Sequence, residues 1–192
     1  VTLTGWATLD AGETQIPSTI TFDGGNSTFC DSEADRQALI DTFGWTITDG
    51  GKDCPIDFTN ALITTWETTV ASESITLPTV SGLTYNYAVD WGDGTIETNI
   101  NGSASHTYAS AGIQTISIIG TFPRLNFRFS ADRNKIRTIE QWGVIQWSSM
   151  EEAFRGCSNL EVVAIDAPDL SSVTTLKSMF NGCTSMVGNS FF

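Results

Sequence analysis

Three closely spaced acids, Asp90, Asp93 and Glu97, are the residues of this chain whose chemistry is easiest to propose. Carboxylate oxygens are the ligands that Ca²⁺ prefers, so the group is a candidate calcium site, although its spacing is not that of an EF-hand loop. A structural interpretation is simpler: Asp93 belongs to a turn, Asp90 accepts backbone N–H bonds and Glu97 faces water. The sequence therefore offers calcium as a hypothesis and implies no other cofactor.

His106 is the single histidine, so any histidine-dependent acid–base or Ser-His-Asp chemistry would have to use it. The chain has no G-x-S-x-G, no H-E-x-x-H and no glycine-rich phosphate loop. These are local signatures of hydrolases, zinc proteases and nucleotide-binding proteins. A glycosidase-type pair of carboxylates depends on the fold and stays open. We expect a protein that is not an enzyme.

The four cysteines form two pairs by position. A disulfide between Cys30 and Cys54 would close a loop of about 25 residues and stabilise the fold by about 3 kcal/mol. The other pair, Cys157 and Cys183, is left open between a disulfide and two buried thiols. Zinc is not expected, because no two cysteines have C-x-x-C spacing and the histidine is distant.

Residues 150–160 and 176–186 are two copies of one unit, offset by 26 residues, in which Phe154 aligns with Phe180. A fixed period of this size predicts a leucine-rich-repeat solenoid, in which each unit buries its apolar side against its neighbours. We expect the repeat region to be incomplete at its C-terminus, as part of a longer protein.

Read backwards, the same offset pairs further apolar residues, and we expect these pairs to occupy equivalent positions in successive repeats. They are Ile136 with Val162, Ile139 with Ile165, Val144 with Leu170, and Trp147 with Val173. Trp147 should then lie in the repeat core. Trp91 is predicted to be buried beside a hairpin turn, whereas Trp6, Trp45 and Trp66 have no clear assignment. Two exposed tryptophans on one face would suit sugar stacking or a protein contact.

Residues 1–60 predict a strand at 19–22, a helix that begins with a capping box at Ser32 and ends at Gly44, and a strand at 45–48. This α+β segment is typical of the last unit or cap of an upstream repeat array. Residues 61–122 lack a helical period and predict short strands around a hairpin turn at Asp93-Gly94. Such spacing is typical of a small antiparallel sandwich, with strands at 63–66, 74–77, 85–89, 95–98 and 114–119.

The middle segment resembles the polycystic-kidney-disease (PKD) domains, which are immunoglobulin-like β-sandwiches of extracellular bacterial proteins. The resemblance is carried by residues 89–95 (VDWGDGT), 106–108 (HTY) and 112–116 (GIQTI). It implies a structural role for six motif residues, with His106 and Tyr108 holding a loop against the sheet; the others are Trp91, Gly92, Asp93 and Gly94.

Residues 123–192 resemble the BspA-like leucine-rich-repeat surface proteins of bacteria, through 150–160 (MEEAFRGCSNL) and 166–176 (DAPDLSSVTTL). The expected fold is thus mainly β with short helices, in three parts: an α+β segment at 1–60, a sandwich at 61–122 and repeats at 123–192. No linker composition separates the last two parts, so we expect them to pack directly against each other.

The net charge of −13 is unevenly distributed. Residues 1–123 hold 15 acids and two basic residues, whereas residues 124–192 hold seven of each sign. An acidic surface disfavours nucleic acid as a partner, and no segment has the 18 apolar residues of a membrane span. Four arginines near the start of the repeats are expected either to join the two modules or to receive an acidic partner: Arg124, Arg128, Arg133 and Arg137.

The resemblances imply a secreted, extracellular bacterial cell-surface protein that adheres through its repeat face to a protein or glycan on another surface, with the sandwich as a rigid spacer. Two alternatives stay open at this stage. The chain is a segment of an extracellular filament or phage fibre, with flanking modules or copies of itself as partners, or it is an accessory part of a larger secreted hydrolase.

Overall fold

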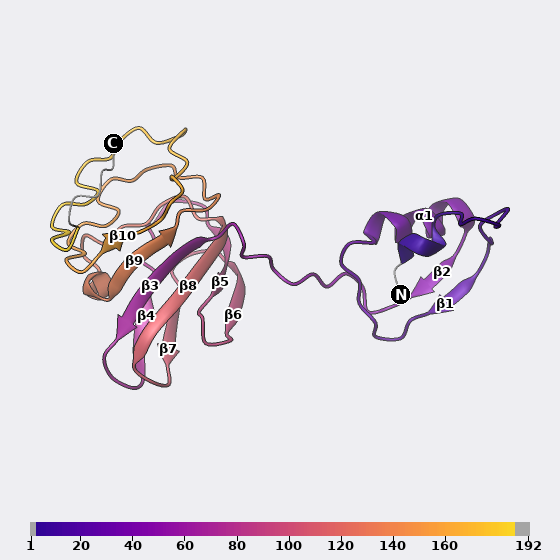
Figure 1. Cartoon of the computed structure of the whole chain (residues 1–192), viewed down its shortest axis with the longest axis horizontal. Helices are drawn as coiled ribbons and strands as arrows, with labels where there is room; N and C mark the ends of the chain where they lie inside the picture. The colour runs from indigo at the N-terminus through magenta and orange to yellow at the C-terminus, as the bar shows by residue number, and fades with distance from the viewer. Residues whose placement is uncertain (1–2, 187–192) are drawn as a thin grey trace. The chain divides into compact units, whose positions relative to one another are not determined.

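The computed structural model of the chain describes residues 3–186 and is mainly β, with a single α-helix in the described part (Figure 1). It divides into two compact units, residues 1–56 and 57–192. The N-terminal unit contains a 3₁₀ turn η1 (Leu3–Trp6), β1 (Thr21–Asp23), α1 (Glu33–Phe43) and β2 (Thr46–Thr48). The predicted strand, helix and strand are therefore confirmed.

Strands β1 and β2 pair in parallel, with Phe22 opposite Ile47, and α1 connects them. The helix ends where the sequence predicts, because Gly44 adopts a left-handed conformation (φ 67°) and its N–H caps the last turn. The predicted capping box is wrong at the other end: Ser32 precedes the helix, but its side chain makes no capping hydrogen bond.

The N-terminal unit has a thin core. Among its described apolar residues only Leu3 and Leu39 are fully buried, while Trp6, Phe22 and Trp45 stay half-exposed. The predicted disulfide Cys30–Cys54 is present and joins the segment before α1 to the segment after β2. A covalent crosslink offsets the small amount of buried apolar surface.

The second unit is built on a six-stranded sheet in the order β10-β9-β3-β8-β5-β6 (Figure 1). A two-stranded sheet, β4 with β7, accompanies it. The bounds are β3 Leu62–Thr68, β4 Glu73–Thr76, β5 Asn86–Asp90, β6 Ile96–Ile100, β7 Ser105–Tyr108, β8 Gly112–Thr121, β9 Ile136–Gln141 and β10 Glu161–Val162. The five strands predicted from the sequence correspond to β3, β4, β5, β6 and β8, whereas β7 was not predicted.

One hydrophobic core runs through the whole second unit, so the predicted division after residue 122 does not separate compact units. Strand β9 pairs with β3 and thereby joins the repeat region to the sheet of the middle region. Trp66 of β3 packs against Phe127 with ring centroids 5.5 Å apart, and Phe122 contacts Trp147 at 6.3 Å. Trp91 and Trp147 are buried, as predicted.

The repeat register differs from the predicted one in its first half. Strands β9 and β10 pair in parallel with Ile139 opposite Val162, 23 residues apart, so the predicted matches of Ile136 with Val162 and Ile139 with Ile165 are wrong. A later bridge, Gln146 with Asp169, keeps the 23-residue spacing, so the predicted match of Val144 with Leu170 is wrong as well. Three extra residues lie in the second copy after Asp169, and they restore the 26-residue offset only from Leu176 onward.

Beyond that insertion the two copies repeat closely. The rings of Phe154 and Phe180 stack 5.5 Å apart at an interplanar angle of 11°, and Phe127 stacks on the other side of Phe154 at 5.9 Å. The backbone recurs as well, because Gly156 and Gly182 have φ of 80° and 85° at equivalent positions. Gly182 also lies close to the Gly156 backbone, where a Cβ would come within 3.4 Å.

Candidate functional site

The three candidate calcium ligands each bind a different donor of the protein. Asp90 accepts the Gly92 N–H at 2.8 Å, and Glu97 accepts the Trp91 indole N–H at 3.0 Å. Asp93 binds His106 Nε2 at 2.7 Å. In residues 3–186, no group of three or more acidic, histidine or cysteine side chains is arranged to hold a metal ion. The geometry gives these carboxylates structural partners.

The six motif residues come together at the β5–β6 turn. The Trp91 ring stacks on His106 with centroids 5.2 Å apart, and the Tyr108 hydroxyl donates to the Trp91 carbonyl at 2.9 Å. Gly92 has a φ of 82°, and a Cβ there would lie 2.2 Å from the Thr115 carbonyl oxygen, so no other residue fits without rearrangement. Gly94 completes the turn with a φ of 94°.

The pKa shifts of Asp93 and Tyr108 reflect the same contacts at this turn. The His106 hydrogen bond, followed by that of the Thr95 N–H, outweighs partial burial and lowers the pKa of Asp93. Burial raises the pKa of Tyr108, whose hydroxyl is already committed to Trp91. His106 is thus held by an aspartate and two aromatic rings, which is an arrangement suited to fixing a loop.

The second cysteine pair is present as free thiols. Burial, with a smaller contribution from Cys183, raises the pKa of Cys157 strongly. Burial also raises the pKa of Cys183 to about 11, and its thiol donates to the Phe154 carbonyl at 3.1 Å. Both thiols therefore stay protonated at neutral pH and act as core residues of low nucleophilicity.

Each of the four arginines binds a partner within the chain. Arg137 of β9 pairs with Glu67 of β3 and so joins the two regions of the second unit. Arg124 contacts Glu151, while Arg128 pairs with Glu152, and Arg133 donates to the Arg128 carbonyl.

A polar groove of about 590 Å³ lies between the segment after β4 and the loop before η2 (Ala131–Asn134). Pro78 and Val80 line one side, and Asn126, Arg128 and Phe129 line the other. Phe129 is 85% exposed, and the Arg128 guanidinium lies over its ring at 4.6 Å. An exposed aromatic residue beside an arginine is typical of a binding surface.

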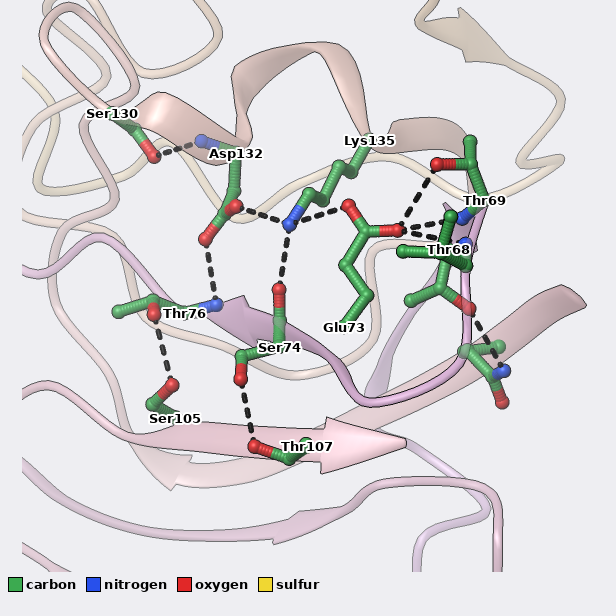
Figure 2. A network of polar contacts seen from close by, with 12 residues as sticks. Thr68, Thr69, Glu73, Ser74, Thr76, Ser105, Thr107, Ser130, Asp132 and Lys135 are labelled. Atoms are coloured by element: carbon green, nitrogen blue, oxygen red, sulfur yellow. Dashed lines mark hydrogen bonds and ion pairs between the residues drawn. The ribbon is translucent and has the colours of Figure 1, made fainter. Parts of the chain in front are cut away.

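The wall of this groove is held by an ion network around Lys135, shown in Figure 2. Lys135 Nζ lies 2.7 Å from Asp132, 3.0 Å from Glu73 and 2.6 Å from the Ser74 carbonyl. The other carboxylate oxygen of Asp132 accepts the Thr76 N–H at 2.9 Å. Through these contacts η2 is fixed to β4, and the two sides of the groove keep their separation.

The network shifts the pKa of two of its members. The Thr69 N–H, followed by Lys135, lowers the pKa of Glu73 to about 2, against the opposing effect of burial. Burial disfavours the charge of Lys135, but the hydrogen bonds that its ammonium donates to Asp132 and Glu73 outweigh burial and raise the lysine pKa. These charges stabilise one another, so the network suits positioning rather than proton transfer at neutral pH.

Sequence reasoning missed this groove. Arg128 was noticed only as part of an arginine cluster, and Phe129 was not singled out. No strand-like pattern separates the buried Phe127 from the exposed Phe129, because residues 128–129 form a turn closed by the Ser130 N–H to the Phe127 carbonyl and the two-residue alternation of a strand ends there.

Comparisons with known proteins add no identification: no family model, no curated protein and no solved structure matches this chain. Within residues 3–186 no helix has the length and apolar character needed to cross a membrane.

Proposed function

We propose that this chain is a non-enzymatic binding module of a secreted, BspA-like bacterial cell-surface protein, with a PKD-like sandwich and leucine-rich repeats fused through one core. It adheres to a protein or glycan on another surface through the groove between the segment after β4 and the start of the repeat region. The supporting observation is the groove beside Phe129, whose ring is 85% exposed and lies under the Arg128 guanidinium.

The chemistry of the groove suits recognition better than turnover. Its charged residues are already paired: Glu152 with Arg128 and Arg155, and Asp132 with Lys135. Paired charges leave neither a general base nor an acid poised for reaction, whereas the aromatic ring of Phe129 remains for contact with a ligand.

The rigidity of the second unit supports the same proposal. Stacked phenylalanines and a sheet shared by both regions hold the groove on a fixed scaffold. A preorganised surface loses less conformational entropy on binding, which favours adhesion through modest contacts. The Cys30–Cys54 disulfide accords with an extracellular location, because disulfides persist in oxidising compartments.

Glycan and protein arrays probed with the labelled full chain test this function. We expect capture of a defined ligand class, and at least a tenfold loss with Phe129→Ser, as for an interface hot spot. Ile113→Ser is the matched control, because Ile113 is an exposed apolar residue of β8 outside the groove. Absence of any captured ligand, or equal loss in both variants, contradicts the proposal and favours a spacer in a filament.

A further inference from the structure

The N-terminal unit has an aromatic groove of about 340 Å³ that the proposed function does not use. Trp6, Phe22 and Trp45 line it together with Pro17. Trp6 and Trp45 lie 6.0 Å apart at an interplanar angle of 37°, and Trp6 meets Phe22 edge-on at 5.1 Å. Two tryptophans without a sequence-based assignment therefore share one hollow.

The groove is preformed by its own contacts. The Trp45 indole N–H donates to the Pro17 carbonyl at 2.7 Å, which fixes the ring and the facing loop together. Backbone bonds from Thr19 to Phe43 and from Thr46 to Ile20 tie the same loop to α1 and β2. The aromatic walls are thus held in place without a ligand, which lowers the entropic cost of binding.

The charge around the groove has one sign. Glu13 is the charged residue among those that line it. Residues 1–56 contain nine acids and two basic residues, Arg36 and Lys52. Both basic side chains are occupied in ion pairs, with Asp49 and Glu33 respectively. A ligand with a positive charge next to its apolar part would therefore complement this surface.

We propose that this groove binds an extended, proline-rich segment of a partner protein that carries a basic residue. Proline-rich chains in the polyproline II conformation dock into aromatic-lined grooves with little loss of entropy, and Glu13 is placed to pair with the basic residue. A glycan fits less well, since the Thr8 hydroxyl is already bonded to the Thr4 carbonyl and the lining is otherwise mostly apolar.

A second copy of the chain is a poor occupant. Of the five prolines, Pro123 alone has a basic neighbour, Arg124, and neither residue is exposed. The partner is therefore expected to be a different protein, and this inference does not depend on the groove beside Phe129.

Fluorescence anisotropy with the full chain tests the proposal, using a labelled nonapeptide of three Pro-Pro-Arg units and its Pro-Pro-Glu twin. We expect the basic peptide to bind in a salt-sensitive manner and the acidic one at least tenfold more weakly. Trp45→Ala should reduce affinity by tenfold or more. Glu13→Lys should do the same, and Glu13→Gln should reduce it about threefold.

Glu13 is exposed, so its variants keep the test meaningful if Trp45→Ala fails to fold. Ile113→Ala, at an exposed residue of the other unit outside both grooves, is the matched control and should bind like the parent chain. The proposal is overturned if the basic peptide does not bind at millimolar concentration, if both peptides bind equally, or if Glu13→Lys has no effect. Concentration-dependent dimerisation abolished by Glu13→Lys would also overturn it, in favour of self-association.

Discussion

The two units of this chain are stabilised in different ways. The N-terminal unit buries few apolar side chains and is crosslinked by Cys30–Cys54, whereas the second unit has a continuous aromatic core and keeps Cys157 and Cys183 as thiols. The difference shows that a small unit with a thin core gains stability from a constrained chain. In the larger unit, the continuous apolar core reaches a similar end by burial alone.

The largest expected effect comes from opening the phenylalanine stack. Phe154→Ala should destabilise the second unit by about 3–5 kcal/mol, because Phe154 is fully buried between Phe127 and Phe180. Urea unfolding followed by circular dichroism measures the loss. The exposed Phe129→Ala should stay within about 0.5 kcal/mol of the parent chain, and an equally small effect of Phe154→Ala would contradict a shared repeat core.

Removing the crosslink should act on the other unit. Cys30→Ser with Cys54→Ser should destabilise residues 1–56 by about 3 kcal/mol, since the unfolded loop regains its entropy. Thermal melting monitored by tryptophan fluorescence should show a lower melting temperature for the N-terminal unit. Replacing Cys157 and Cys183 with alanine provides the comparison. This change is expected to lower mainly the melting temperature of the second unit. Alkylation in denaturant without reductant, followed by intact mass, should label two thiols per chain; four would refute the disulfide.

A smaller effect is expected at the network that joins η2 to β4. Glu73→Gln should cost about 1.5 kcal/mol at neutral pH, because it removes a charged hydrogen-bond acceptor from Lys135. The folded pKa of Glu73, about 2, lies below its usual 4.5, so its stabilisation is complete above pH 4.5. This contribution is lost as pH falls from 4.5 through about 2. Urea denaturation measured at several pH values in that window should show an unfolding free energy that changes less with pH in the variant than in the parent chain. An identical pH dependence in both chains would contradict the network.

The smallest expected effect concerns calcium. Asp90, Asp93 and Glu97 already bind separate protein donors, so adding Ca²⁺ or a chelator should leave the melting temperatures unchanged. Differential scanning calorimetry checks this. An increase of several degrees with Ca²⁺ that Asp93→Asn removes would restore the calcium hypothesis.

Much of the local structure could be predicted from the sequence, because it is encoded by neighbouring residues. Gly44 ends α1, and the Asp93-Gly94 turn joins β5 to β6, as short-range turn chemistry requires. The Cys30–Cys54 disulfide could also be predicted, because the positions of the four cysteines divide them into two pairs. Ser32 was misjudged, since a capping box depends on a side-chain rotamer that the sequence does not determine.

Long-range pairing was harder to predict. The 26-residue offset was correct around Phe154 but wrong at Ile139, because an insertion after Asp169 changes the spacing between equivalent positions of the two copies. The groove beside Phe129 was missed for a related reason. It is formed by segments about 50 residues apart, and their proximity depends on β9 pairing with β3.

Hydrogen exchange measured by mass spectrometry, with and without reductant, tests the central claim most directly. If the crosslink stabilises the first unit and the shared core the second, reduction should remove protection from residues 1–56 and leave β3, β8 and β9 protected together. Equal loss of protection in both units, or separate opening of β9 from β3 and β8, would contradict this account.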